Sequence, residues 1–128
     1  MDVGEAVKKH ISLDFDGVIH SFTSSWTSEY EIHDAPVPGA FEFIRKAIDG
    51  GWGVHILTAR VQNVAAERAV VSWLLQHGLE VEYVNQIVVS SLKRGAHVYI
   101  DDRGHRFDGT WPTLEQIEGM NPWNKVPT

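Results

Sequence analysis

Short apolar stretches alternate with helical stretches along most of this chain, and no other feature limits the fold as strongly. His10–Phe15 is too short and too apolar for a helix, whereas Gln62–His77 has helical spacing and ends before Gly78. Strands that alternate with helices favour a parallel sheet. The sequence therefore predicts an α/β domain with a mostly parallel sheet. Its other predicted elements are a helix that begins at Pro38, a strand over Gly53–Leu57, a strand within Val81–Ser90 and a strand over His97–Ile100.

Both long helices are predicted to bury one apolar face against the sheet, because apolar residues recur in them at helical spacing. In the first helix this face is formed by Phe41, Ile44 and Ile48. In the second helix the predicted buried stripe is formed by Val64, Val71, Leu74 and Leu75.

The length of 128 residues suits a single domain, residues 1–128, with one core. Residues 19–37 are polar and aromatic, and they predict a long loop, or flap, inserted after the first strand. In residues 110–128, Trp111 and Trp123 predict a tail packed on the core. Thr113 and Gln116 fit a capping box, so a short helix is expected over 114–118.

Composition excludes several classes of function. The formal net charge of −6 argues against tight non-specific binding to nucleic acid, although a local basic pocket is compatible with it. The chain contains no cysteine, which excludes disulfides and thiolate chemistry. We find neither a signal-peptide pattern nor an apolar run of membrane-spanning length, so a cytoplasmic protein without membrane contact is expected.

Polar residues follow the predicted strand ends, where ligands bind in open parallel sheets. Several like charges at one edge would repel and raise one another's pKa unless a cation lay among them. A hard divalent cation such as Mg²⁺ meets this need with carboxylate ligands and leaves room for phosphate oxygens. The residues concerned are Asp14, Asp16, Thr58, Lys93, Asp101 and Asp102.

These residue types fit phosphoryl transfer. Lys93 supplies a positive charge and Thr58 a hydroxyl, and both suit the binding of phosphoryl oxygens. A carboxylate beside them can attack phosphorus and form an acyl-phosphate. A second carboxylate two residues further on can give a proton to the leaving group and later take one from water.

The same residues resemble the four ordered motifs of the haloacid dehalogenase (HAD) superfamily. The matching stretches are Asp14-Phe15-Asp16-Gly17-Val18, Leu57-Thr58, Lys93 and Ile100-Asp101-Asp102, which together span most of the chain. The resemblance implies a Rossmann-like three-layer α/β/α sandwich. Neither gap in which the superfamily inserts a cap is long here, so a member without a large cap domain is expected.

The resemblance also implies a role for each matching residue. Asp14 would be the nucleophile and a Mg²⁺ ligand, and Asp16 would be the general acid/base and offer its backbone carbonyl to the metal. Thr58 and Lys93 would bind the phosphoryl group. Asp101 would be a direct Mg²⁺ ligand, and Asp102 would act through a metal-bound water. An aspartate at position 16 is typical of the phosphatases of the superfamily rather than of its dehalogenases.

The expected function is thus a magnesium-dependent phosphatase that forms an aspartyl-phosphate. The stretches Tyr99–Arg103 and Phe107–Gly109 are similar to small stand-alone members of the superfamily from phages and bacteria. This resemblance does not point to a particular substrate. An open site would admit a nucleotide, a nucleic-acid end or a phosphoprotein, and a homodimer would cover it.

Two other classes of protein remain open at this point. A signalling receiver domain has similar length and residue types, but it places the acidic pair after the first strand and a lone aspartate after the third. A phosphate-binding module without turnover would keep the same motifs. Arg60 and Arg103 flank two motifs and either steer phosphate or lie on the surface. Trp26 and Tyr30 either stack on a base or cover the site.

Overall fold

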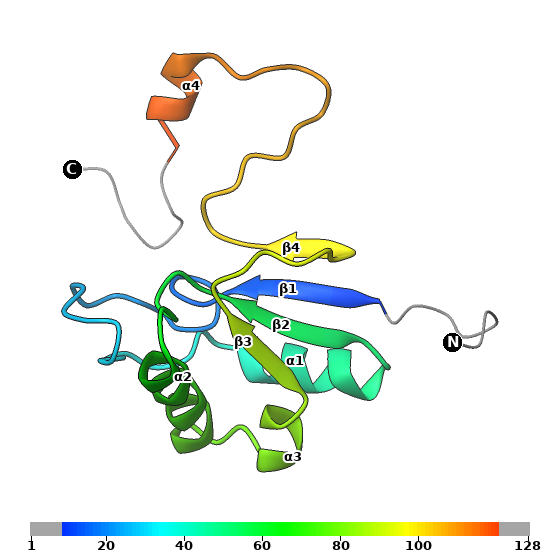
Figure 1. Ribbon diagram of the computed structural model, residues 1–128. Helices are drawn as coiled ribbons and strands as arrows, with labels where there is room; N and C mark the ends of the chain where they lie inside the picture. The colour runs from blue at the N-terminus through cyan, green and yellow to red at the C-terminus, as the bar shows by residue number, and fades with distance from the viewer. Residues whose placement is uncertain (1–8, 121–128) are drawn as a thin grey trace.

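The computed structural model describes residues 9–120 as one α/β domain (Figure 1). β1 and β2 are each followed by a helical connection, as the alternation in the sequence predicts, whereas β3 and β4 are joined by the non-helical segment 91–97. The elements in chain order are β1 (His10–Asp14), α1 (Ala40–Asp49), β2 (Gly53–Leu57), α2 (Val64–Gln76), α3 (Val81–Val84), β3 (Ile87–Ser90), β4 (Val98–Ile100) and α4 (Leu114–Glu118).

The four strands form one all-parallel sheet in the order β3-β2-β1-β4, which confirms the predicted fold class. Leu13 pairs with Ile56 of β2 on one side and with Ile100 of β4 on the other. From β1 the chain steps outward through β2 to β3 and then returns to place β4 on the far side of β1. The order therefore reverses between β1 and β4, which is where open α/β sheets form ligand crevices. The arrangement is Rossmann-like and carries no large cap.

The hydrophobic core lies on one face of the sheet. Both crossovers, β1 to β2 and β2 to β3, run in the same direction, so right-handed connections place their helices on the same side. Phe41 and Ile44 of α1 and Leu74 of α2 pack there against Leu13 and Ile56 of the strands. The predicted stripe of α2 was partly wrong, because Val64 and Leu75 are exposed. The residues of α2 that are buried are Ala66, Val70, Trp73 and Leu74.

The opposite face of the sheet is polar. Ser12 of β1 and His55 of β2 are neighbours in the sheet, lie on this face and are both buried. Within residues 9–120, helices pack only on the other face. This polar face is covered by the segment 91–97, which crosses from β3 to β4 (Figure 1).

The strand predicted within Val81–Ser90 begins later than expected. Residues Val81–Val84 form the short helix α3, and only Ile87–Ser90 belongs to β3. The Val-Glu-Tyr-Val sequence has the alternation of a strand, but tertiary packing decides its conformation: Val84 is buried, and Tyr83 donates a hydrogen bond to Asp49 at the end of α1.

The two segments outside the alternation behave differently. Residues 19–37 contain no helix or named strand, and isolated β-bridges join His20 to Asp16 and to Pro36. The tail is not packed on the core over residues 110–120: Trp111 is 81% exposed and no residue of α4 is buried. In Figure 1, α4 stands apart from the sheet. Thr113 and Gln116 form the expected capping box, and Trp123 lies outside the described residues.

Among the helices of residues 9–120, none has the length and apolar character needed to cross a bilayer.

Candidate active site

The carboxyl ends of β1, β2 and β4 bring most of the predicted site residues to one edge of the sheet. A cavity of about 490 Å³ opens there, and its lining includes Asp14, Asp16, Thr58 and Asp102. A neighbouring cavity of about 500 Å³ is lined by Lys93, Asp101 and again Asp14. The structure thus divides the six residues between two adjoining cavities, with the Asp14 carboxylate at both.

Asp14 lies in the most unfavourable electrostatic position of the site. The pKa of its carboxyl is raised to about 7, mainly by burial and also by the nearby carboxylates of Asp102 and Asp16, against one hydrogen bond that lowers it. That bond is donated by the backbone N–H of Phe15 to Asp14 Oδ1 over 2.8 Å. A carboxylate held this way attracts a cation or a proton.

The two adjacent acids after β4 have different surroundings. Asp102 approaches Asp14, and its Oδ1 is buried without a hydrogen-bond partner in residues 9–120. The turn after β1 leaves room for this approach only because residue 17 is glycine: a Cβ there would lie 2.2 Å from Asp102 Oδ2, at a φ of 89°. Asp101 is exposed, and its Oδ1 accepts from the backbone N–H groups of Arg103 and Gly104.

Asp16 is held in an ion pair with a buried arginine. Arg60 donates from Nε to Asp16 Oδ2 over 3.1 Å and from Nη2 to Oδ1 over 2.9 Å. Arg60 is only 3% exposed, so little water screens the pair. Burial acts to raise the pKa of Asp16, but hydrogen bonds from His20 and Arg60 outweigh it and keep this pKa below its ordinary value.

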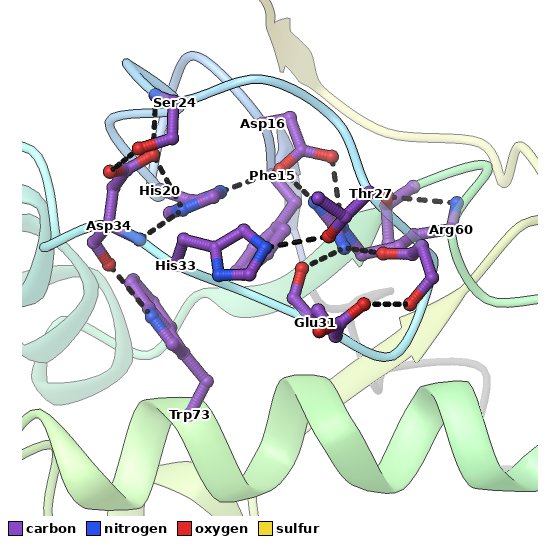
Figure 2. A network of polar contacts seen from close by, with 12 residues as sticks. Phe15, Asp16, His20, Ser24, Thr27, Glu31, His33, Asp34, Arg60 and Trp73 are labelled. Atoms are coloured by element: carbon purple, nitrogen blue, oxygen red, sulfur yellow. Dashed lines mark hydrogen bonds and ion pairs between the residues drawn. The ribbon is translucent and has the colours of Figure 1, made fainter.

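His20 is fixed in one tautomer by its two partners (Figure 2). The backbone N–H of Asp34 donates to His20 Nε2 over 3.0 Å, so Nε2 carries the lone pair. Nδ1 therefore carries the proton and donates it to Asp16 Oδ1 over 2.7 Å. His20 is buried against the rings of Phe15 and Trp73, which fix its orientation.

Arg60 also ties the flap, residues 19–37, to the site. Its Nη1 donates to the carbonyl oxygens of Ser28 and Glu31, each over 3.0 Å. The ring of Trp26 lies over the guanidinium, with 4.5 Å between the ring centroid and Cζ. Trp26 and Phe22 of the flap line the same cavity as Asp14. The flap therefore forms one wall of the candidate site, and Trp26 has one ring face committed to Arg60.

Thr58 and Lys93 are placed on different sides of Asp14. Thr58 is 4% exposed, and its Oγ1 accepts from the backbone N–H of Arg60 over 3.2 Å, so it also shapes the turn after β2. Lys93 lies in the neighbouring cavity, where its Nζ is 4.7 Å from the centroid of the Tyr99 ring. Their phosphate-binding roles stay predictions.

The fit of this site to a divalent cation is partial. The carboxylates of Asp14 and Asp102 lie close together, and Oδ1 of Asp102 has no hydrogen-bond partner in residues 9–120. Oxygen ligands of this kind suit a hard cation. The carboxylate of Asp16 is already paired with Arg60. Within residues 9–120, no three His, Cys, Asp or Glu side chains come together in a group that could hold a metal ion.

Arg60 and His20 are the residues whose importance the sequence did not reveal. Arg60 is not the surface residue that one alternative expected, because it is buried, pairs with Asp16 and lines the same cavity as Asp14; its contact with phosphate stays a prediction. A signal was present: two acids after one strand require a cation, and an arginine follows the next strand at the same edge. His20 likewise stands four residues after Asp16.

Searches of known family models and of curated proteins gave no match to this chain. The function must therefore be argued from the site.

Proposed function

We propose that the protein is a phosphatase of the HAD type, which hydrolyses a phosphomonoester through an aspartyl-phosphate on Asp14 with Mg²⁺ as cofactor. The observation that carries the proposal is the crowding of Asp14 and Asp102 at the point where the strand order reverses, beside the hydroxyl of Thr58. Two carboxylates side by side with a buried oxygen left unpaired are costly unless a cation or a proton lies between them.

In the proposed reaction a carboxylate oxygen of Asp14 attacks phosphorus, and the bond between phosphorus and the ester oxygen breaks. The leaving oxygen takes a proton from Asp16. Water then attacks phosphorus and gives a proton back to Asp16, which releases inorganic phosphate and restores Asp14.

Mg²⁺ would be held by Asp14 and Asp102 and would neutralise charge on the phosphoryl oxygens. This departs from the expected direct ligand, Asp101, which is exposed and accepts hydrogen bonds from the backbone of its own turn. Thr58 and Lys93 would orient the phosphoryl oxygens.

One observation favours a second candidate, a phosphate-binding domain without turnover. Asp16 can donate a proton only after it acquires one, and the bonds from Arg60 and His20 oppose that protonation. Turnover therefore requires that Arg60 part from Asp16. A protein in which this ion pair never opens would bind a phosphate group and not hydrolyse it.

The deciding experiment measures phosphate release from p-nitrophenyl phosphate and a panel of nucleotides, with Mg²⁺ and with chelator. The wild-type protein is expected to turn over with Mg²⁺ only, and Asp14→Asn to lose at least about a hundredfold of that rate because it removes the nucleophile. Asp49→Asn is the matched control, since Asp49 ends α1 and bonds Tyr83 instead. Binding of phosphate without any turnover would support the second candidate.

A further inference from the structure

A third cavity lies near the amino ends of β1 and β2, at the end of these strands that is remote from Asp14. Its volume is about 310 Å³. It is lined by the first residues of the two strands, His10 and Gly53, by His55 on the polar face, and by the segment 91–97 through Arg94. None of these residues belongs to the proposed phosphatase site.

A buried imidazole in the wall of this cavity lacks one hydrogen-bond partner. His55 is 4% exposed, its Nδ1 lies 3.3 Å from Ser12 Oγ, and its Nε2 is sealed from solvent with no partner in residues 9–120. Ser12 is 2% exposed, and its hydroxyl is hydrogen-bonded to His55.

The hydroxyl of Ser12 determines which nitrogen of His55 carries the proton. If Nδ1–H donated to Ser12, the buried hydroxyl proton would lack an acceptor and Nε2 would lack a donor. If the hydroxyl donates to Nδ1, only one group stays unpaired, the N–H at Nε2. Because an unpaired buried donor is costly, the second arrangement is favoured, and it leaves a donor that needs an acceptor.

The charges around the cavity indicate what that acceptor is. No acidic side chain is among its described lining residues, and no carboxylate in residues 9–120 forms an ion pair with Arg94. Burial lowers the pKa of His55, and the nearby charges of Arg94 and His10 lower it further, so its ring is neutral and keeps one N–H. An uncompensated guanidinium beside an unpaired donor attracts an anion.

We propose that this cavity binds an oxyanion of the size of phosphate. Arg94 supplies the charge, His55 Nε2–H donates to one anion oxygen, and the exposed ring of His10 closes the outer side. The His10 ring lies directly over Gly53, where a Cβ would be 2.2 Å from His10 Nδ1. Arg94 and Gly95 are exposed and line the cavity together with the partly buried Ala96, and the proposal requires this segment to move enough to admit the anion to Nε2.

The test is a titration of the full chain with inorganic phosphate at constant ionic strength, followed by NMR of the uniformly ¹⁵N-labelled protein, which shows histidine rings and backbone amides alike. The free protein should show His55 protonated at Nε2, and its ring signals should shift and saturate as phosphate is added. Arg94→Gln should weaken this binding at least about tenfold, since it removes the guanidinium charge that attracts the anion. Arg68→Gln, an exposed arginine of α2, is the matched control and should bind as the wild type does.

Parallel titrations with sulfate and acetate separate a phosphate-shaped site from a carboxylate site, and saturation with any of the three supports an oxyanion. The inference is overturned if His55 carries its proton on Nδ1, if no oxyanion shifts its ring signals, or if Arg94→Gln binds unchanged. The backbone amide of Thr58 reports on the phosphatase site in the same spectra. A response at Thr58 without one at His55, or the reverse, therefore distinguishes failure of one proposal from failure of the other.

Discussion

Arg60 makes more of the contacts that organise the candidate site than any residue of the sequence motifs does. Its guanidinium joins the Asp16 carboxylate, two flap carbonyls and the Trp26 ring, and it does so almost fully buried. We expect Arg60→Leu to lower the free energy of unfolding by about 3 kcal/mol, because it leaves a partly buried carboxylate without its partner. Chemical denaturation with urea measures this.

Arg60→Lys tests the geometry of the pair rather than its charge. A single ammonium cannot hold both oxygens of Asp16 and the two flap carbonyls at once, so we expect about half of the loss seen for Arg60→Leu. Arg68→Leu changes the same residue type at an exposed position and should stay within about 0.5 kcal/mol of the wild type. Equal stabilities of Arg60→Leu and Arg68→Leu would contradict the interpretation.

Asp14 makes the stability of the metal-free protein depend on pH. Its pKa is raised by burial from 3.8 to about 7, so the folded state holds this proton more tightly than the unfolded state does. The tighter binding of this proton adds to the free energy of unfolding in full below about pH 4, and this stabilisation is lost as the pH rises through 7. Asp14→Asn should thus be more stable than the wild type at pH 8, by about 1–2 kcal/mol after allowance for solvent screening of a partly exposed group.

Thermal or urea unfolding from pH 4 to pH 8 in chelator checks this, and the advantage of Asp14→Asn should shrink toward the acid end. Addition of Mg²⁺ at pH 8 should stabilise the wild type and not Asp14→Asn, since binding to the folded state alone raises its stability. An Asp14→Asn protein that is less stable than the wild type at pH 8 would show that Asp14 is not electrostatically strained.

At the scale of elements, the flap is held to the rest of the domain by side chains rather than by regular structure. Arg60 bonds its middle, Asn63 Nδ2 donates to Tyr30 over 3.0 Å, and Trp73 Nε1 donates to the Asp34 carbonyl over 3.0 Å. The sequence indicated that residues 19–37 form a loop, but it did not indicate where on the domain this loop packs, and these contacts explain why. Each partner is more than 28 residues away along the chain, and no local pattern encodes such a pair.

Trp73→Phe should loosen the flap at its base while the core stays packed. Phenylalanine keeps most of the edge contacts with Phe15 and Phe41 but lacks the N–H that bonds the Asp34 carbonyl. We expect amide hydrogen exchange in residues 21–37 to become about fivefold faster, the effect of one net hydrogen bond. Trp52→Phe is the control, because Trp52 contacts His97 outside the flap, and it should leave flap exchange unchanged. Equal exchange in both variants would contradict the role of Trp73.

At the scale of the whole molecule, the alternation of strands and helices was sufficient to predict the parallel sheet and the edge at which Asp14, Asp16, Thr58 and Asp102 meet. It succeeds because parallel strands place their carboxyl ends together whatever the details of packing. It fails where packing decides: α3 reads as a strand, and the α2 stripe shifts to Ala66, Val70, Trp73 and Leu74. The pairing of Asp16 with Arg60 depends on side-chain placement, and the sequence carried only an indirect signal for it, an arginine after the neighbouring strand end.

The tail supplies the last prediction, because aromatic residues in it pointed to packing that residues 110–120 do not show. The ring of Trp111 contacts the ring of Phe107, and Leu114 of α4 is exposed. Since exposed apolar side chains contribute little to folding, Trp111→Ser combined with Leu114→Ser should change the free energy of unfolding by less than about 0.5 kcal/mol. The matched pair Trp73→Ser and Leu74→Ser, on the buried face of α2, should abolish cooperative unfolding. A loss above about 1.5 kcal/mol in the tail variant would place the tail on the core after all, because only burial gives such side chains that much effect.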